Sequence, residues 1–305
     1  MASAERFSLF PCAFVHAGGT LNLTQMDGFD VKGNSRKNAI IPGGAVDRAH
    51  IGIASAAPSA TFNTRDLTTL FTDVSGSAGL AISGAATFRL QERSNSSTFE
   101  TGATHETFTA ASGFLYPTSI SASQDGEDGA SCSCEFVPHW DGSTNPFVHN
   151  TGVNFDAVNA PAFVSRFFLG PVYSNTTQIA GVVSINVDFG ITYDARPFNG
   201  APYASLGAII KREPTLSITV AKIDTLSALT MFGNAVDTSF SIYLQKGVAS
   251  GTRVAGVTST HCKISCTAGD MTNDSVSVTG NDDGTATLTV MPTTVVAVSV
   301  ASAIP

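Results

Sequence analysis

One stretch decides the fold class: Val183-Ser184-Ile185-Asn186-Val187-Asp188-Phe189-Gly190-Ile191-Thr192-Tyr193, in which apolar residues alternate with small or polar residues. A period of two residues is typical of a β-strand that buries one face. The pattern therefore predicts one long strand over 183–193. The chain around it is rich in Ser, Thr, Val and Gly, which favour strands and tight turns, so we expect a mainly β protein.

Two further stretches predict β-hairpins. Apolar residues alternate over 276–278 and again over 286–290, on either side of Asn281-Asp282-Asp283-Gly284. Asp-Gly favours the positive φ angles of a tight hairpin turn. The same arrangement recurs around Asp125–Gly129, so each half of the chain is expected to contain one such hairpin.

Short segments recur in the same order at a nearly constant offset in the sequence. Phe88-Arg89-Leu90-Gln91 resembles Ile242-Tyr243-Leu244-Gln245 at an offset of 154, and Pro58 matches Pro214 at an offset of 156. Three other pairs match at offsets of 155, 158 and 160, in this order: Asp128-Gly129 with Asp283-Gly284, Asp66-Leu67 with Asp224, and Pro42 with Pro202. The series indicates a tandem duplication, although chance similarity between two low-complexity β segments would also produce it.

The duplication predicts two β-sandwich domains, over 1–145 and 155–293, followed by a C-terminal arm over 294–305. Asp141–Pro146 is rich in turn-forming residues and is the candidate linker. One short flanking helix is expected in each domain. The two helices are placed at Asn63–Phe71 and around Ile223, Leu226 and Leu229, with Gly233 as the C-cap.

Two long segments rich in Gly and Pro, 28–57 and 194–213, are expected to be loops. Loops of this length inside a compact domain usually serve a function or an interface. The first holds a group of basic residues, namely Lys32, Arg36, Lys37 and Arg48. Their spread suits salt bridges to an acidic neighbour better than a nucleic-acid patch.

Composition excludes several classes of protein. Sixteen Lys and Arg against 24 Asp and Glu give a net charge of −8, which argues against a phosphate-neutralising nucleic-acid binder. No apolar run approaches the length of about 18 residues that a membrane helix needs, and no signal peptide is recognised. Five cysteines is an odd number, which argues against a full disulfide framework and favours a reducing compartment.

No motif predicts catalysis, a metal or a cofactor, so we expect the chain not to be an enzyme. Cys132 and Cys134 share a strand face with Phe136, and Cys262 shares one with Cys266, so these thiols are expected in the core. The six histidines have no paired metal spacing. No Gly-x-Ser-x-Gly elbow and no phosphate-binding glycine loop is present.

A duplicated, non-catalytic β protein with long loops suggests self-assembly. Exposed sheet edges are a hazard unless they are paired or closed. A duplicated domain lets three chains build a ring with six similar positions, in which neighbouring edges join into a closed barrel. The charged fraction of 13% fits this interpretation, because interface cores are depleted in charge.

Each half also shows a Pro-led extended segment, a short helix, a Leu-Gln strand and a hairpin. The Pro-led segments are Pro58-Ser59-Ala60-Thr61-Phe62 and Pro214-Thr215-Leu216-Ser217-Ile218. In this order of elements the chain resembles the tail tube, or major tail, proteins of long-tailed bacteriophages, in the variant with two tandem tube domains. The resemblance covers most of the chain but contains no diagnostic motif.

The resemblance implies trimeric, pseudo-sixfold rings that stack into a virion tube, assemble in the host cytoplasm and enclose a tape-measure protein. It implies that 28–57 and 194–213 contact the adjacent ring, with Arg196 and Tyr203 beside the four basic residues. Strand 183–193 would lie in the tube wall. A conduit should repel DNA phosphates rather than bind them. The candidate lumen residues are Asp27, Asp30, Asp188 and Asp194.

Two other classes compete with this interpretation. A double jelly-roll capsid protein is also duplicated, β-rich and trimeric, but each jelly roll needs eight strands and the second half predicts about six. A tandem carbohydrate-binding or adhesin module usually presents clustered aromatic residues, whereas this chain has one tryptophan, Trp140, and five tyrosines.

Overall fold

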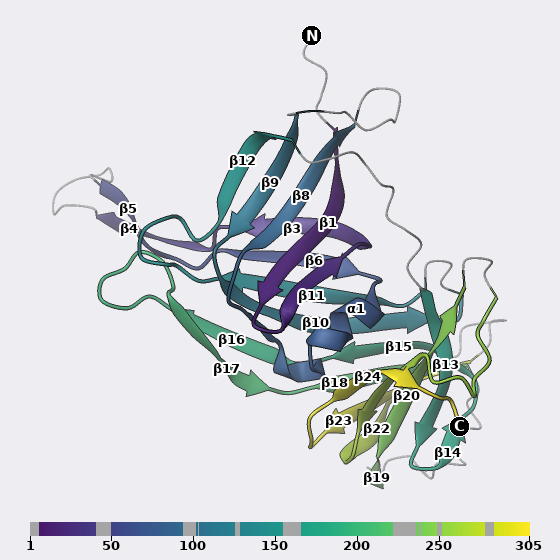
Figure 1. The fold of residues 1–305 in the computed structure, drawn as a ribbon. Coiled ribbons are helices and arrows are strands. Elements are labelled where there is room, and N and C mark those ends of the chain that lie inside the picture. The colour runs from purple at the N-terminus through teal and green to yellow at the C-terminus, as the bar shows by residue number, and fades with distance from the viewer. Residues whose placement is uncertain are drawn as a thin grey trace.

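The computed structural model describes residues 6–40, 50–93, 102, 104–125, 129–154, 166–221, 236–237, 239–248, 252–277 and 284–305. In these residues the protein is mainly β, as predicted, and its strands pair antiparallel (Figure 1). One α-helix, α1 (Leu67–Asp73), and one 3-10 turn, η1 (Gly76–Ala78), lie among the described segments.

The strands form two series, which we call the N-terminal half and the C-terminal half. The first series is β1 (Arg6–His16), β2 (Gly19–Leu23), β3 (Met26–Lys32), β4 (Ser35–Ile40), β5 (His50–Ala56), β6 (Ser59–Thr64), β7 (Leu80–Ile82), β8 (Ala86–Arg93), β9 (His105–Ala110), β10 (Gly113–Ser123), β11 (Ser131–Pro138) and β12 (Val148–Val153). The second is β13 (Arg166–Ser174), β14 (Thr177–Ile179), β15 (Val182–Asp188), β16 (Ile191–Arg196), β17 (Leu206–Arg212), β18 (Thr215–Val220), β19 (Val236–Asp237), β20 (Phe240–Gly247), β21 (His261–Cys266), β22 (Gly269–Ser277), β23 (Thr285–Pro292) and β24 (Ala297–Ser302).

Each half has one five-stranded sheet of its own. The strand order is β12-β9-β8-β1-β2 in the first and β24-β21-β20-β13-β14 in the second. The second order is the first with twelve added to every label, so the described strands follow one another in the same sequence through space.

A ten-stranded sheet runs through both halves. Its order is β19-β22-β23-β18-β15-β10-β11-β6-β3, and β7 pairs with β10 beside this path. The strands of the two halves meet where β10 pairs with β15 (Figure 1). In the C-terminal half, the order from the joint to the outer edge is β15-β18-β23-β22. It matches the order β3-β6-β11-β10, which runs from the outer edge to the joint in the N-terminal half.

The core of the N-terminal half is a layer of phenylalanine rings from two facing sheets. Phe14 of β1 and Phe88 of β8 contact Phe62 of β6 and Phe136 of β11, with ring centroids 5.8–5.9 Å apart. All four side chains are buried, and the buried apolar cluster continues through β15, β18 and β23 into the C-terminal half. Alternating residues supply this layer, because every second side chain of a strand points to the same face.

Helix α1 begins where Asp66 caps it. The Asp66 carboxylate accepts hydrogen bonds from the backbone N–H of Thr69 (3.3 Å) and from its hydroxyl (2.6 Å), as N-cap residues do. Leu67 and Leu70 are fully buried, and the helix starts four residues later than the predicted start at Asn63. Helix α1 contacts both β2 and β24 and so bridges the two halves. The helix expected around Ile223 lies outside the described residues.

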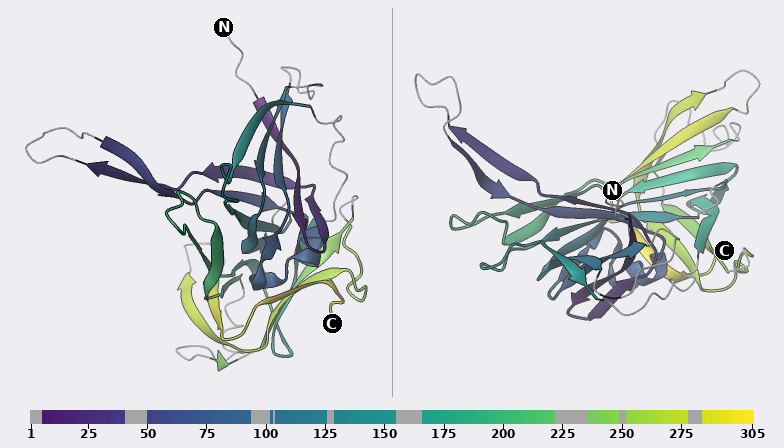
Figure 2. Two further views of the ribbon diagram at one scale, coloured as in Figure 1. Left: turned by 60° about the vertical axis from the view of Figure 1, so that its left-hand side comes forward. Right: turned by 90° about the horizontal axis from the view of Figure 1, so that it is seen from above.

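The segments expected to be long loops contain β-hairpins, so that prediction is wrong. In 28–57, β4 pairs with β5, and in 194–213, β17 pairs back onto β16. Figure 2 shows the β4–β5 hairpin extending away from the two large sheets. Gly and Pro residues between short strands led to the loop interpretation, while the pairing partner that makes each segment a strand lies ten or more residues away.

The predicted single strand over 183–193 is broken into β15 and β16. The break falls at Phe189 and Gly190, and Gly190 has φ of +56°, a left-handed conformation that favours glycine. A Cβ on Gly190 would also clash with the backbone carbonyl of Glu213. The apolar alternation continues through this corner because Ile191 and Tyr193 also find partly buried surroundings.

Two other expectations change. The segment 294–305 contains β24, which pairs with β21, and Val296 is fully buried, so this part of the chain is a strand of the sheet and not an arm. The C-terminal half also contains β13–β24, more strands than the six used to disfavour a jelly roll. Sequence reasoning undercounted them because strands as short as β14 and β19, of three and two residues, carry too few side chains to show an alternation.

Candidate assembly interface

The ten-stranded sheet buries one face and leaves the other polar. We call the polar side the open face. On β6, Ala60 and Phe62 point into the core while Thr61 and Asn63 lie on the open face, and the cross-strand register carries this division from strand to strand. The polar residues that it places on the open face from β3 to β22 are Asp27, Asp30, Lys32, Thr61, Asn63, Ser131, Ser133, Glu135, Ser119, Ser121, Ser123, Ser184, Asn186, Asp188, Thr215, Ser217, Thr219, Thr285, Thr287, Thr289, Asp270, Thr272, Ser275 and Ser277. The same register also places apolar or aromatic residues on this face, namely Phe114, Tyr116, Val137 and Met291.

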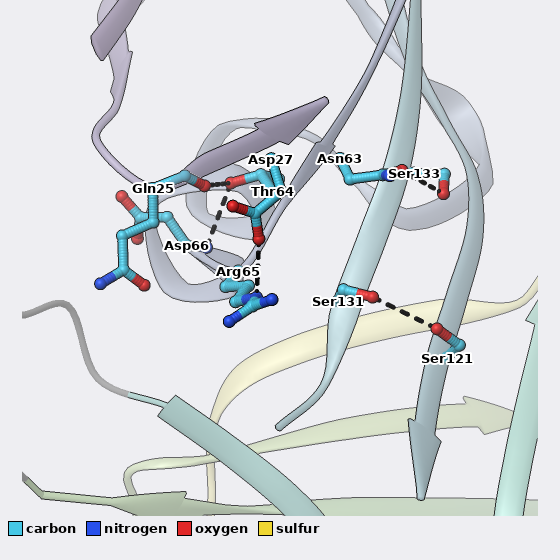
Figure 3. A network of polar contacts seen from close by, with 9 residues as sticks. All are labelled: Gln25, Asp27, Asn63, Thr64, Arg65, Asp66, Ser121, Ser131 and Ser133. Carbon is cyan, nitrogen blue, oxygen red and sulfur yellow. Dashed lines mark hydrogen bonds and ion pairs between the residues drawn. The ribbon is translucent and has the colours of Figure 1, made fainter. Parts of the chain in front are cut away.

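Hydrogen bonds between short side chains cross the strands of the open face (Figure 3). The Ser133 hydroxyl donates to the Asn63 carbonyl oxygen at 2.6 Å, and the hydroxyls of Ser121 and Ser131 are 3.2 Å apart. Cross-strand pairs of this kind each stabilise a sheet by roughly 0.2–1 kcal/mol. The open face is therefore an ordered surface of neutral polar groups.

The charges on the open face are mainly acidic. Asp27, Asp30 and Asp188 lie on it and are exposed, so the sheet brings together three of the four candidate lumen residues. Asp27 pairs with Arg65 at 2.8 Å (Figure 3), and Asp30 lies 3.5 Å from Lys32. The fourth candidate, Asp194, lies on β16, outside the ten-stranded sheet.

A continuous backbone ladder forms the joint between the halves. Ser119–Ser123 of β10 pairs with Ser184–Asp188 of β15, and Ile120 lies opposite Val187. The ladder is extended by the N–H of Phe189, which donates to Thr118 (2.9 Å), and by that of Gln124, which donates to Val183 (2.8 Å). Ile120 and Val187 are both fully buried.

An aromatic cluster lies beyond the Ser119–Asp188 end of this joint, where the β16–β17 hairpin meets the first part of β10. The Tyr193 ring stacks on Phe114 of β10, with centroids 4.7 Å apart and planes within 2°, and lies 5.9 Å from Tyr116. The Tyr193 hydroxyl is 2.6 Å from Nε2 of His139. Burial raises the pKa of Tyr193 to about 12 and lowers the pKa of His139, so both side chains are neutral near pH 7. Burial, assisted by a 2.8 Å hydrogen bond to Glu135, raises the pKa of Tyr116.

The candidate linker is also fixed to this hairpin. Asp141 accepts hydrogen bonds from the backbone N–H groups of Thr144 and Ser143, and these bonds lower the pKa of its carboxyl to about 2. The Tyr203 hydroxyl donates to Asn145 at 2.9 Å. Asp141–Pro146 is thus an ordered turn, and β12, which follows it, still belongs to the sheet of the N-terminal half.

The remaining candidate interface residues lie near the hairpins. Lys32 ends β3, Arg36 and Lys37 lie on β4, and Arg196 pairs with Asp194 on β16. Arg48 lies outside the described residues. Tyr203 contacts its own chain: Ala56 forms a parallel bridge to it, and the Trp140 ring is 6.0 Å from its ring.

Both ends of the ten-stranded sheet have an unpaired edge in the described part of the chain. β3 pairs only with β6, and β22 pairs with β23 along its length and with β19 at Asp270 and Met271 alone. Ser275, Val276 and Ser277 are exposed, and Val276 is 40% exposed. Sequence reasoning missed this edge and the Tyr193 cluster. The edge could have been found from Val276, which is an apolar residue at the otherwise polar end of its strand.

Reactive chemistry is not concentrated anywhere in the described segments. All five cysteines are buried and none forms a disulfide, which confirms the predicted core position of Cys132, Cys134, Cys262 and Cys266. Burial raises the pKa of Cys12 and Cys262 to about 12, so these thiols stay protonated and unreactive. No group of three or more His, Cys, Asp or Glu side chains that could hold a metal ion occurs among the residues with described positions.

No α-helix in the described part of the structure is long and apolar enough to cross a lipid bilayer. No protein-family model matches the sequence, and no curated protein matches it.

Proposed function

We propose that this chain is a structural protein that self-assembles, three copies to a ring, into stacked rings that form the tail tube of a long-tailed bacteriophage. In this proposal the chain is a tandem duplication of a β-sandwich tube domain. The first domain takes in β1–β12, beyond residue 145, and the second takes in β13–β24, beyond residue 293.

Matching strand orders support the duplication. A matching pair of buried histidines supports it further: His105 Nδ1 accepts a hydrogen bond from the backbone N–H of Glu92 (3.2 Å), and His261 Nδ1 accepts one from Lys246 (3.0 Å). His105 and His261 are related by a sequence offset of 156, and each lies in the strand next to the Leu-Gln strand of its half. Two unrelated domains would have no reason to share this internal bond.

The observation that carries the assembly proposal is the ten-stranded sheet, which has an unpaired edge at each end in the described part of the chain. Unpaired edges expose backbone N–H and C=O groups and invite pairing with another chain. Adding further copies edge to edge would close the sheet into a barrel, which removes every edge. The joint between β10 and β15 supports this, because it is an edge-to-edge pairing that the two halves already make.

The open face supports a role as the inner wall. Neutral hydroxyl and amide groups with an excess of carboxylates would repel DNA phosphates and give them few cations to bind. The same surface would enclose a tape-measure protein during assembly. Replacing Asp27 and Asp188 by Lys is expected to leave tubes intact and slow genome ejection most at low salt; unchanged ejection kinetics across salt would count against a repelling wall.

Electron microscopy of the purified protein tests the proposal against its competitors. A tail-tube protein gives hollow tubes, a double jelly-roll capsid protein gives closed shells, and an adhesin module gives dispersed particles. Val276→Asp places a charge on the β22 edge and is expected to abolish tubes. Val257→Asp is the matched control, because Val257 is 84% exposed and lies outside that edge. Shells, or tubes that survive Val276→Asp, would contradict the proposal.

A further inference from the structure

We propose that residues 275–277 of β22 pair antiparallel with residues 30–32 of β3 in a second copy of this chain. Ser275 lies opposite Lys32, Val276 opposite Val31, and Ser277 opposite Asp30. The inference rests on the proposed function in that it names the partner and register of the assembling edge. It is derived from the joint that the chain makes with itself.

The first step is that β22 matches β10 residue by residue. The β10–β11 pairing has a bulge between Pro117 and Ser119, and the β22–β23 pairing has one between Asn273 and Ser275. The two bulges are therefore related by a sequence offset of 156, the same as that of the paired histidines. Bulges fix register and are built-in features of a sheet, so a shared bulge aligns the two strands without ambiguity.

The second step is that β3 and β15 each contain a bulge and have the same pairing register after it. A bulge separates Asp27 from Phe29 in the β3–β6 pairing, and another, one position earlier in the alignment, separates Val182 from Ser184 in the β15–β18 pairing. Beyond the bulge the registers coincide, because Val31 lies opposite Ala60 and Val187 lies opposite Leu216. Both members of these two pairs are again related by an offset of 156.

The third step transfers the observed joint. In the chain, Ser119 lies opposite Asp188, Ile120 opposite Val187, and Ser121 opposite Asn186. Shifting the β10 residues by 156 forward, and the β15 residues by 156 back, gives the three pairs named above. The strand order permits this, because β22 and β3 are the counterparts of β10 and β15, and neither has a neighbour in the described part of the chain along the residues concerned.

Exposure of the apolar edge residue supports the pairing. Ile120 is fully buried in the joint, whereas its counterpart Val276 is 40% exposed. Val31, the counterpart of Val187, is partly buried against the core. A valine on an exposed strand edge is an aggregation hazard in a monomer, and pairing with a second copy would bury it beside Val31.

Charge at the matching positions supports a second copy as the partner. Tyr193 and Phe114, which stack at the joint, correspond by the same shift to Lys37 and Asp270. Lys37 lies on β4 and Asp270 is exposed on β22, so a basic and an acidic residue occupy the sequence positions that match the two stacked rings. A different partner protein would not be expected to share this spacing.

Disulfide cross-linking tests the register. Ser275→Cys on one chain and Lys32→Cys on another are mixed and oxidised, because opposite residues of an antiparallel pair lie about 4.5–5.5 Å apart at Cα and can be bridged. The native cysteines are buried and leave the background low. Ser119→Cys with Asp188→Cys, the in-chain counterpart, should close within one chain without any gain in mass. Val276→Cys with Lys32→Cys, shifted by one residue, is the negative control.

We expect the mixed chains to give a covalent dimer, at least tenfold more of it than the shifted pair, and the in-chain control to verify folding and oxidation. Tubes without this dimer, or equal dimer from the shifted pair, would overturn the register and leave the proposed function standing. A specific dimer in closed shells would uphold the joint and overturn the tube. A folded chain that never cross-links or assembles would overturn both.

Discussion

The described part of the chain contains one joint between two sheet edges, formed by β10 and β15, and two outer edges, on β3 and β22, that have no partner there. At the inner joint, β10 and β15 share a backbone ladder and bury Ile120 against Val187, and the stacked rings of Tyr193 and Phe114 lie beyond one end of the ladder. At the outer edges, the matching positions hold an exposed valine and charged residues. Under the proposed assembly, the inner joint is permanent and the outer joint forms only when a second copy is present.

The chemistry of the two places fits this division. An aromatic pair contributes roughly 0.5–1.5 kcal/mol beyond its buried area, and that contribution does not depend on salt. Exposed ion pairs contribute about 0.2–1 kcal/mol and are screened by salt. Under the proposed assembly, an aromatic outer edge would promote aggregation of the free chain. A charged edge would oppose aggregation and would still recognise a complementary edge.

The largest effect is expected from placing a charge in each joint. Ile120→Asp should lower the free energy of unfolding by about 4 kcal/mol or more, because an unpaired carboxylate would be buried in the core. Val276→Asp should change the stability of the unassembled chain by less than about 0.5 kcal/mol, because the position is partly exposed there. Urea unfolding of the dispersed protein measures the free energy of unfolding of both variants. Similar losses in the two variants would contradict the distinction between the inner joint and the outer edge.

Removing the stacked ring should give the next largest effect. Tyr193→Ala is expected to cost about 2 kcal/mol, from lost apolar burial and lost contact with Phe114. Asp270→Asn, at the position matching Phe114, is the control and should leave the free energy of unfolding within about 0.5 kcal/mol. Thermal and urea unfolding compare the variants, and an unaffected Tyr193→Ala chain would show that the backbone ladder alone holds the halves together.

Lowering the pH should weaken the inner joint. Burial lowers the pKa of His139 in the folded chain, so the unfolded chain binds more protons below about pH 6.5. The stabilisation is fully present above that pH and is lost as the pH falls through the window toward the lowered pKa. His139→Gln should flatten this part of the stability profile between pH 7.5 and 5. A profile identical to that of the wild type would mean that His139 does not titrate at the joint.

Elements governed by local pattern were predicted from the sequence. The hairpins β10–β11 and β22–β23 are confirmed, because their alternation and Asp-Gly turns are local signals. The burial of Cys132 and Cys134 followed from the same alternation. Asp27, Asp30 and Asp188 were selected for their charge, and the sheet places all three on the open face.

Features that depend on distant partners were not predicted. The β10–β15 joint pairs strands that lie far apart in the sequence, and the residues of neither strand indicate which strand will be its partner. The Tyr193 cluster collects Phe114, His139 and Tyr193 from three separate elements. The corner at Gly190 was missed because the apolar alternation continues through it, while the close approach of Glu213 that requires glycine exists only in the folded chain.

The smallest expected effect is that of salt. Raising salt from 0.05 to 0.5 M should reduce assembly several-fold, since each screened ion pair is worth well under about 1 kcal/mol. The stability of the unassembled chain should stay almost constant over the same range, because rings and apolar contacts hold the inner joint. Light scattering and unfolding at matched salt concentrations give the two readouts. Salt-independent assembly would argue against a charged outer joint.

Hydrogen exchange at the two matching strand segments tests the central claim most directly. In the dispersed chain, the backbone amides of 119–123 that face β15 should be protected, while the outward-facing amides of 275–277 should exchange rapidly. In the assembled protein, both segments should be protected to a similar degree. Rapid exchange at 275–277 after assembly, or protection there before assembly, would contradict the claim that the chain repeats its own inner joint with its neighbours.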